Sequence, residues 1–181
     1  MNRIDHINLM AQYNAWMNTK LYEAATNLSE KELVTDRKAP FGSIIGILNH
    51  LVVGDTLWLK RFAAHPANYA ALEPILNFPA PTSLDQILFA DIQSLSNHRK
   101  LLDQVITKLG HSLKDDDLEH VLTYTNVKGV VAHKNFFSLL MHFFNHQTHH
   151  RGQATTLLWQ SNVDIGVTDL LALVPNENGA P

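Results

Sequence analysis

A helical repeat crowded with histidines, close to the C-terminal end, is the feature that most constrains this chain. Four histidines fall between positions 142 and 150. Spacings of four and three residues place six side chains on one helix face: Leu139, Phe143, His146, His150, Gln153 and Leu157. A face of this kind packs against a core. Because it is apolar at both ends and polar in the middle, we expect a core helix with a site at its centre.

His146 and His150 are the polar pair at the centre of this face. They are one helical turn apart, so their Cβ atoms lie about 5–6 Å from each other. Two imidazoles at this spacing can bind one metal ion. In the alternative interpretation they are hydrogen-bonded core histidines, which requires partners for all of their buried ring nitrogens. Both interpretations stay open at this point, and a metal would need at least one further ligand.

A third ligand could come from the segment between residues 44 and 61. Its apolar face includes Ile47, Leu51 and Trp58, and His50 lies beside that face as the only histidine of the segment. One histidine from this helix and two from the last would give a metal three nitrogens and an open position. Reactive zinc sites have this arrangement.

Sequence strings in both segments resemble the DinB family. They are Asn49-His50-Leu-x-x-x-Asp55-x-x-Trp58 and His142-Phe-x-Asn-His146-x-x-x-His150-Arg-Gly-Gln153. Two shorter strings match as well, Tyr13-Asn14-x-Trp16-x-Asn18 near the start and Thr168-Asp169-Leu170 near the end. The string around His146 is specific, whereas the one near the start is weak alone. The resemblance covers nearly the whole chain.

The resemblance implies a four-helix bundle that holds a divalent metal ion, Zn²⁺ or Ni²⁺, with His50, His146 and His150. The chain shows no departure from the family pattern at these three positions, and a His142/His146 pair is the less favoured alternative. The family takes its name from DNA-damage-inducible proteins. Its wider DinB/YfiT-like group of metalloenzymes includes thiol-dependent S-transferases and a maleylpyruvate isomerase.

Length and composition predict a single domain over residues 1–181, long enough to bury a sizeable core. The formal net charge is −3 and both signs are mixed along the chain, so nucleic acid is not an expected partner. The absence of cysteine excludes disulfides and thiolate ligands and fits a cytoplasmic protein. We expect no signal peptide, because the N-terminus lacks the apolar run of one. We expect no membrane partner, because no run of ~20 apolar residues occurs.

Apolar periodicity predicts an all-α fold with four long helices, which agrees with the four-helix bundle that the resemblance implies. The length of the first connector favours an up-down-down-up topology for this bundle. The long helices are expected at residues 4–27, 43–64, 82–109 and 134–160. The connector over 65–82 contains four prolines, and its length favours a crossover between parallel neighbours. The connector over 111–133 contains two β-rich stretches, which predict a short hairpin that could cover the site.

Local signals refine the helix boundaries. Ser29 with Glu32 predicts a short capped turn, and Ser43 is the expected N-cap of the second long helix. Ser83 with Gln86 predicts the start of the third long helix, and Gly110 its end. A further short helix is expected near residues 169–173.

Some polar side chains on these helices have more than one possible role. Asn14 lies on an apolar stripe and could reach the site, and Asp55 could orient an imidazole or pair with a Lys or Arg. Gln153 could contact a ligand at the metal. Arg151 lies off the histidine face, so we expect it only to hydrogen-bond loop carbonyls.

The remaining histidines offer rivals to the three proposed ligands. His98 lies on an apolar stripe and is the main rival, although a lone histidine in such a place is usually structural. His142 and His149 are additional histidines of the last helix. His65, in the first connector, is expected to be exposed to solvent.

Three neutral imidazoles leave a divalent ion its double charge and an exchangeable position, which suits activation of water or a thiol. The nitrogen ligands fit Zn²⁺, Ni²⁺, Co²⁺ or Cu²⁺. The first hypothesis is a metal-dependent enzyme with S-transferase-like chemistry on a small molecule, with a low-molecular-weight thiol as partner. The alternatives are a non-catalytic metal-binding stress-response protein and a metal-dependent hydrolase, which is weakened because Asp91 is the one candidate general base. We expect a homodimer.

Overall fold

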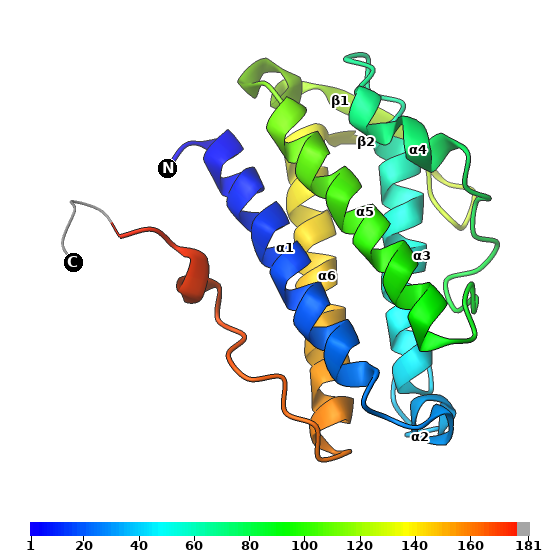
Figure 1. Cartoon of the computed structure of the whole chain (residues 1–181). Coiled ribbons are helices and arrows are strands. Elements are labelled where there is room, and N and C mark those ends of the chain that lie inside the picture. The colour runs from blue at the N-terminus through cyan, green and yellow to red at the C-terminus, as the bar shows by residue number, and fades with distance from the viewer. Residues whose placement is uncertain (177–181) are drawn as a thin grey trace.

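Four long helices packed side by side form most of the molecule in a computed structural model, which describes residues 1–176 (Figure 1). They are α1 (Arg3–Ala25), α3 (Ile44–Phe62), α5 (Ile92–Ser112) and α6 (Phe136–Trp159). Helices α1 and α3 each contact both α5 and α6. Two short helices, α2 (Glu30–Val34) and α4 (Glu73–Leu76), lie in the connections. The expectation of a mostly helical protein is confirmed.

One small antiparallel sheet completes the fold. It pairs β1 (Val121–Thr125) with β2 (Val131–Asn135), so the predicted hairpin is confirmed. The side-chain oxygen of Asn126 accepts hydrogen bonds from the backbone N–H groups of Lys128 and Val130, at 2.9 and 3.1 Å. A short polar side chain of this kind closes a tight turn and therefore sets the hairpin where the sequence indicated it.

Capping residues begin the helices close to the predicted positions. Ser29 and Glu32 form the predicted capping box at α2. The Ser43 hydroxyl accepts a hydrogen bond from the N–H of Gly46 at 3.2 Å and caps α3. These interactions satisfy backbone N–H groups that have no partner within the helix.

The third long helix begins at Ile92 rather than near residue 82, so that prediction was wrong. Asn49 of α3 supplies the reason. Its side-chain oxygen accepts hydrogen bonds from the N–H groups of Leu88 and Phe89 at 2.8 and 3.0 Å, and its amide donates to the Phe89 carbonyl at 2.9 Å. Backbone groups that a helix would need are therefore bonded to α3. Asp91 is the actual N-cap and accepts from Ser94 N–H.

The same helix continues past Gly110, where the sequence predicted its end. A Cβ atom at this position would lie 2.7 Å from the side-chain oxygen of Asn8 in α1. Gly110 therefore allows two helices to approach closely and does not terminate α5.

His65 is buried, contrary to the prediction that it is solvated. It follows α3 and packs against Tyr69 and Phe136, with ring centres 5.2 and 4.7 Å away. Its Nδ1 accepts a hydrogen bond from Ala67 N–H, and its Nε2 lies 3.2 Å from the Asp117 carbonyl oxygen. The chain on both sides of the connector folds over this ring, so a loop position in sequence is interior in space.

Charged side chains meet in the interior between the long helices. The Arg99 guanidinium contacts the carboxylates of Asp55 on α3 and Asp103 on its own helix, and all three side chains are buried. Asn14 and Asn18 of α1 donate to Asp103 at 3.1 and 2.8 Å. A buried charge is tolerated when it is paired and hydrogen-bonded, so this network constrains how α1, α3 and α5 can pack.

The C-terminal segment returns along α1 and includes the 3-10 turn η3 (Leu170–Leu173), close to the short helix expected near residues 169–173. The Tyr13 hydroxyl donates to the Thr168 carbonyl at 2.7 Å and holds the segment in place. Within the described residues, no helix combines the length and apolar character needed to cross a membrane.

We expect Arg99→Leu to lower the free energy of unfolding by about 3–5 kcal/mol, because it leaves the buried carboxylates of Asp55 and Asp103 without their cation. Urea unfolding followed by circular dichroism measures this loss. Arg3→Leu is the control, because Arg3 also contacts two carboxylates but lies at the surface, where ion pairs stabilise little. Equal losses in the two variants would contradict the assigned role of the interior network.

Candidate metal centre

Three histidine nitrogens from two helices converge on one point. The Nε2 atom of His50 on α3 lies 3.2 Å from the Nε2 atoms of both His146 and His150 on α6. The three candidate ligand atoms all lie within 4.8 Å of one another. Tetrahedral zinc with Zn–N bonds near 2.0–2.1 Å would separate its nitrogen ligands by about 3.3 Å. The structure thus brings together the three residues singled out in the sequence, at a spacing that fits a metal ion.

The outer ring nitrogens determine which neutral form of His50 and of His150 is present. Nδ1 of His50 lies 2.8 Å from the Leu84 carbonyl oxygen, and Nδ1 of His150 lies 2.8 Å from the side-chain oxygen of Gln153. Both partners can only accept, so each neutral ring carries its proton on Nδ1. The Nε2 atoms therefore present lone pairs to each other. This arrangement suits a cation between them and opposes the interpretation of a mutually hydrogen-bonded histidine core.

Burial keeps these imidazoles neutral. It lowers the pKa of His50 and of His150 below the ordinary histidine value. The pKa of His146 falls to about 3, first through burial and then through the neighbouring imidazoles. Neutral imidazole is the form that binds metal, so the rings are available as ligands at neutral pH.

Phe41 covers one side of the cluster. Its ring stacks on His50 with ring centres 3.7 Å apart and meets His150 edge-on at 5.6 Å. The Phe41 backbone has φ +61°, an uncommon conformation for a bulky residue. Phe41 lies just before the predicted second long helix, and no spacing pattern marked it as part of the site.

Gly54 makes room for His146. A Cβ atom on Gly54 would lie 2.8 Å from Cε1 of the His146 ring. Gly54 stands one helical turn after His50, on the side of α3 that faces α6. The two helices can therefore bring their histidines together because this turn of α3 lacks a side chain.

A pocket of about 210 Å³ opens beside the cluster. Its walls come from α3, α6, the hairpin and the connector before α5: His50, Gly54, Leu57, Trp58, Arg61, Leu84, Tyr124, Asn126, Val127, His142 and His146. The hairpin side chains lie over the approach to the histidines, as expected for the second connector. A small molecule in this pocket would contact two of the three rings.

Four polar residues that the sequence analysis considered for the site lie apart from the pocket, in the interior or against other rings. Asp55 pairs with Arg99, which is the second of its two expected roles. Asn14 accepts a hydrogen bond from Arg151 in the interior and does not reach the histidines. The prediction for Arg151 was wrong, because it is buried and bonds side chains rather than loop carbonyls. His98 packs against Phe78 and Phe89, away from the cluster.

The additional histidines flank the cluster. His142 lines the pocket and meets the edge of Trp58, with ring centres 5.1 Å apart. His149 lies 3.2 Å from the amide nitrogen of Gln153. Gln153 thus orients His150 and contacts His149, a supporting role that differs from the predicted contact with a ligand at the metal.

Gln147 is an interior residue that the sequence interpretation missed. It is fully buried on α6, and its amide donates to the Asp55 carboxylate. It lies one position from His146, and Arg151 lies one position from His150, so the interior polar pair and the histidine pair form neighbouring lines on one helix. The sequence did contain a signal for this pair, because Gln147 and Arg151 are four residues apart and each directly follows one of the two histidines.

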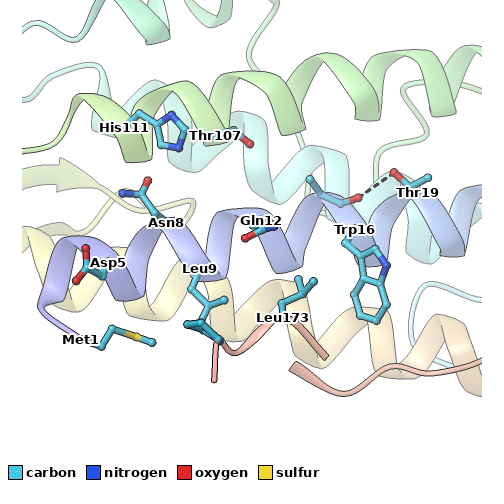
Figure 2. A pocket seen from close by; sticks show the side chains of 12 residues that line it. Met1, Asp5, Asn8, Leu9, Gln12, Trp16, Thr19, Thr107, His111 and Leu173 are labelled. Carbon is cyan, nitrogen blue, oxygen red and sulfur yellow. Dashed lines mark hydrogen bonds between the residues drawn. The ribbon is translucent and has the colours of Figure 1, made fainter. Parts of the chain in front are cut away.

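A larger hollow than the pocket beside the histidines lies elsewhere. It measures about 960 Å³ and runs between α1, the C-terminal part of α5 and the segment around Leu173 (Figure 2). Asp5 and His111 are its titratable side chains, on opposite helices. Among the described residues, His50, His146 and His150 form the only cluster suited to hold a metal, so size alone would identify the wrong place.

We expect Gly54→Ala to weaken Zn²⁺ binding about 10- to 100-fold, because the new methyl group displaces the His146 ring. Competition titration with a chromophoric chelator measures the dissociation constant. Gly152→Ala on α6 is the matched control, because its Cβ atom meets nothing within 4 Å. Both substitutions replace a helical glycine by alanine, which favours the helix by about 1 kcal/mol in each case. Unchanged affinity in Gly54→Ala would show that His146 does not need its present position.

Comparison with known proteins gives a consistent assignment. The model of the DinB family matches residues 1–174. Protein DinB of Bacillus subtilis (strain 168) is 24% identical over 160 residues, which cover 87% of each chain. No solved structure gave a significant match. By the extent of the family match, the chain belongs to the DinB family.

Proposed function

We propose that this protein binds a divalent transition metal ion, Zn²⁺ or Ni²⁺, through His50, His146 and His150 and uses it in chemistry on a small molecule. The observation that carries the proposal is the convergence of three Nε2 atoms, with the protons of two rings held on Nδ1 by Leu84 and Gln153. An ion in this place would supply positive charge and an open position to a thiol or a water molecule.

The chain's own groups would prepare the reaction. The Leu84 carbonyl and the Gln153 side chain hold two imidazoles in the ligating form. Such supporting contacts usually strengthen metal binding. Phe41 shields His50 on one face, while the pocket leaves access from the side of Trp58 and Tyr124. The arrangement favours a small substrate that enters along α3 beneath the hairpin.

Thiol-dependent S-transfer is the favoured reaction class, with a low-molecular-weight thiol as co-substrate. Resemblance to the wider family supports it, and so does the lining of the pocket, which includes no carboxylate among the described residues. A hydrolase commonly needs such a group as general base, and Asp91 serves as a helix cap instead. A non-catalytic metal-binding stress-response protein is the remaining alternative.

Three further predictions belong to this proposal: a cytoplasmic location, a homodimer and the up-down-down-up order of the long helices. The long connector between α3 and α5 supports the helix order, because antiparallel neighbours need only a few residues. The colours of Figure 1 run in the same direction along α3 and α5 and in the opposite direction along α1 and α6.

We expect wild-type protein reconstituted with Zn²⁺ or Ni²⁺ and dialysed without chelator to retain about one ion per chain. The His146→Ala/His150→Ala variant should lose the ion, because one imidazole cannot hold it. His142→Ala/His149→Ala removes as many histidines from α6 outside the cluster and should keep it. Elemental analysis of the three proteins decides, and a folded wild type without metal would overturn the proposal.

The same preparations separate the enzyme from its alternative. Each is incubated with a low-molecular-weight thiol and an alkylating electrophile, and thiol consumption is followed. Metal-dependent turnover that disappears in His146→Ala/His150→Ala supports S-transfer. Stoichiometric metal without turnover of any thiol favours the non-catalytic protein.

A further inference from the structure

The pocket beside the histidines contains an arginine without an acidic partner. Arg61, in the last turn of α3, lines the pocket together with His50 and His146. Its guanidinium carbon lies 4.5 Å from the ring centre of Trp58 and 5.0 Å from that of Tyr124. Within residues 1–176, no carboxylate oxygen comes within 4.0 Å of its nitrogens.

Two of the other arginines of the chain have the acidic partners that Arg61 lacks. Arg99 contacts two carboxylates in the interior, and Arg3 contacts two at the surface. Arg61 is half-buried against aromatic rings, and this burial lowers its pKa from the ordinary arginine value. A partly desolvated cation without a counter-charge is unfavourable. An anion that enters the pocket would offset that cost.

The placement of Arg61 suits recognition at a distance from the metal ligands. His50 and Arg61 stand 11 positions apart on one helix, so their Cα atoms are separated by about 16 Å along the axis. Helical side chains lean toward the N-terminus, which brings the guanidinium over Trp58 and shortens this span. Leu57, Trp58 and Val127 supply apolar and aromatic walls of the pocket.

We propose that Arg61 binds the carboxylate of an elongated small-molecule substrate whose opposite end reaches His50 and His146. The inference rests on the proposed function, because the opposite end is the reacting end. The guanidinium forms two parallel hydrogen bonds with a planar carboxylate. Trp58 and Tyr124 hold its plane and leave the N–H groups to the ligand.

A carboxylate fits this pocket better than a phosphate. Arg61 is the one permanently charged side chain among the residues that line it, so a single negative charge is matched and a dianion is not. The volume of about 210 Å³ also limits the ligand to a short chain. The substrate class is therefore a short carboxylic acid that carries a thiol, or a group which accepts one, at its far end.

The test uses Co²⁺-loaded protein, whose visible absorption reports a thiol at the metal. Mercaptohexanoate and its primary amide are titrated into wild type, Arg61→Ala and Lys60→Ala. We expect wild type to bind the carboxylate about 10- to 100-fold more tightly than the amide. Arg61→Ala should bind both equally while it retains cobalt. A preference that survives in Arg61→Ala would overturn the inference.

Lys60→Ala is the matched control. Lys60 is the preceding residue of α3 and carries the same charge, but it donates to the Leu76 carbonyl and does not line the pocket. Its variant should keep the preference for the carboxylate. Arg61→Lys keeps the charge but not the two parallel N–H donors of the guanidinium, so it should retain part of the preference for the carboxylate. This variant also shows that position 61 tolerates substitution.

A second arm separates this inference from the proposed function. Hexanoate and hexanamide are titrated into metal-free wild type and Arg61→Ala by NMR chemical-shift mapping. An Arg61-dependent preference for hexanoate supports the carboxylate site even when mercaptohexanoate leaves the cobalt spectrum unchanged, which would remove the proposed function alone. Equal binding of hexanoate and hexanamide by metal-free wild type would overturn the carboxylate site.

Discussion

The contact of Arg99 with Asp55 and Asp103 is the interaction on which the rest of the structure depends. These charges are stable in the interior only while all three remain together. Asp55 belongs to the helix that carries His50, and its second partner, Gln147, adjoins His146. The ion pair therefore fixes α3 against α5, and the hydrogen bond from Gln147 to Asp55 sets the height of α3 relative to α6. A shift of α3 by one helical turn along its neighbours would separate both the buried charges and the histidines.

The candidate metal centre is built from this alignment and from small adjustments around it. Gly54 removes a side chain where His146 must fit. Leu84 and Gln153 hold protons on the outer nitrogens of His50 and His150. No single element contains the site: two ligands come from one helix, the third from another, and one supporting carbonyl comes from a connector. Each of these three segments therefore contributes a group that the site needs.

Local signals explain what the sequence could predict. The apolar periodicity of α1, α3 and α6, the caps at Ser29 and Ser43 and the turn at Asn126 act within a few residues, and the structure follows them. Distant contacts explain the errors. Asn49 bonds the chain 40 positions away and delays α5, and His65 is enclosed by segments that no spacing relates to it. Periodicity placed Arg151 off the histidine line of α6, but it could not show that Arg151 and Gln147 bond buried side chains of other helices.

Asn49 has a consequence for how this fold tolerates variation in length. Its side chain attaches the connector to α3 at Leu88 and Phe89, only a few residues after the Leu84 carbonyl that orients His50. The proline-rich chain before that attachment can lengthen or shorten as a surface loop does, while the stretch from Leu84 to Phe89 cannot. Insertions should thus accumulate in the connector before Leu84, while the number of residues between Leu84 and the attachment at Leu88 and Phe89 should stay constant.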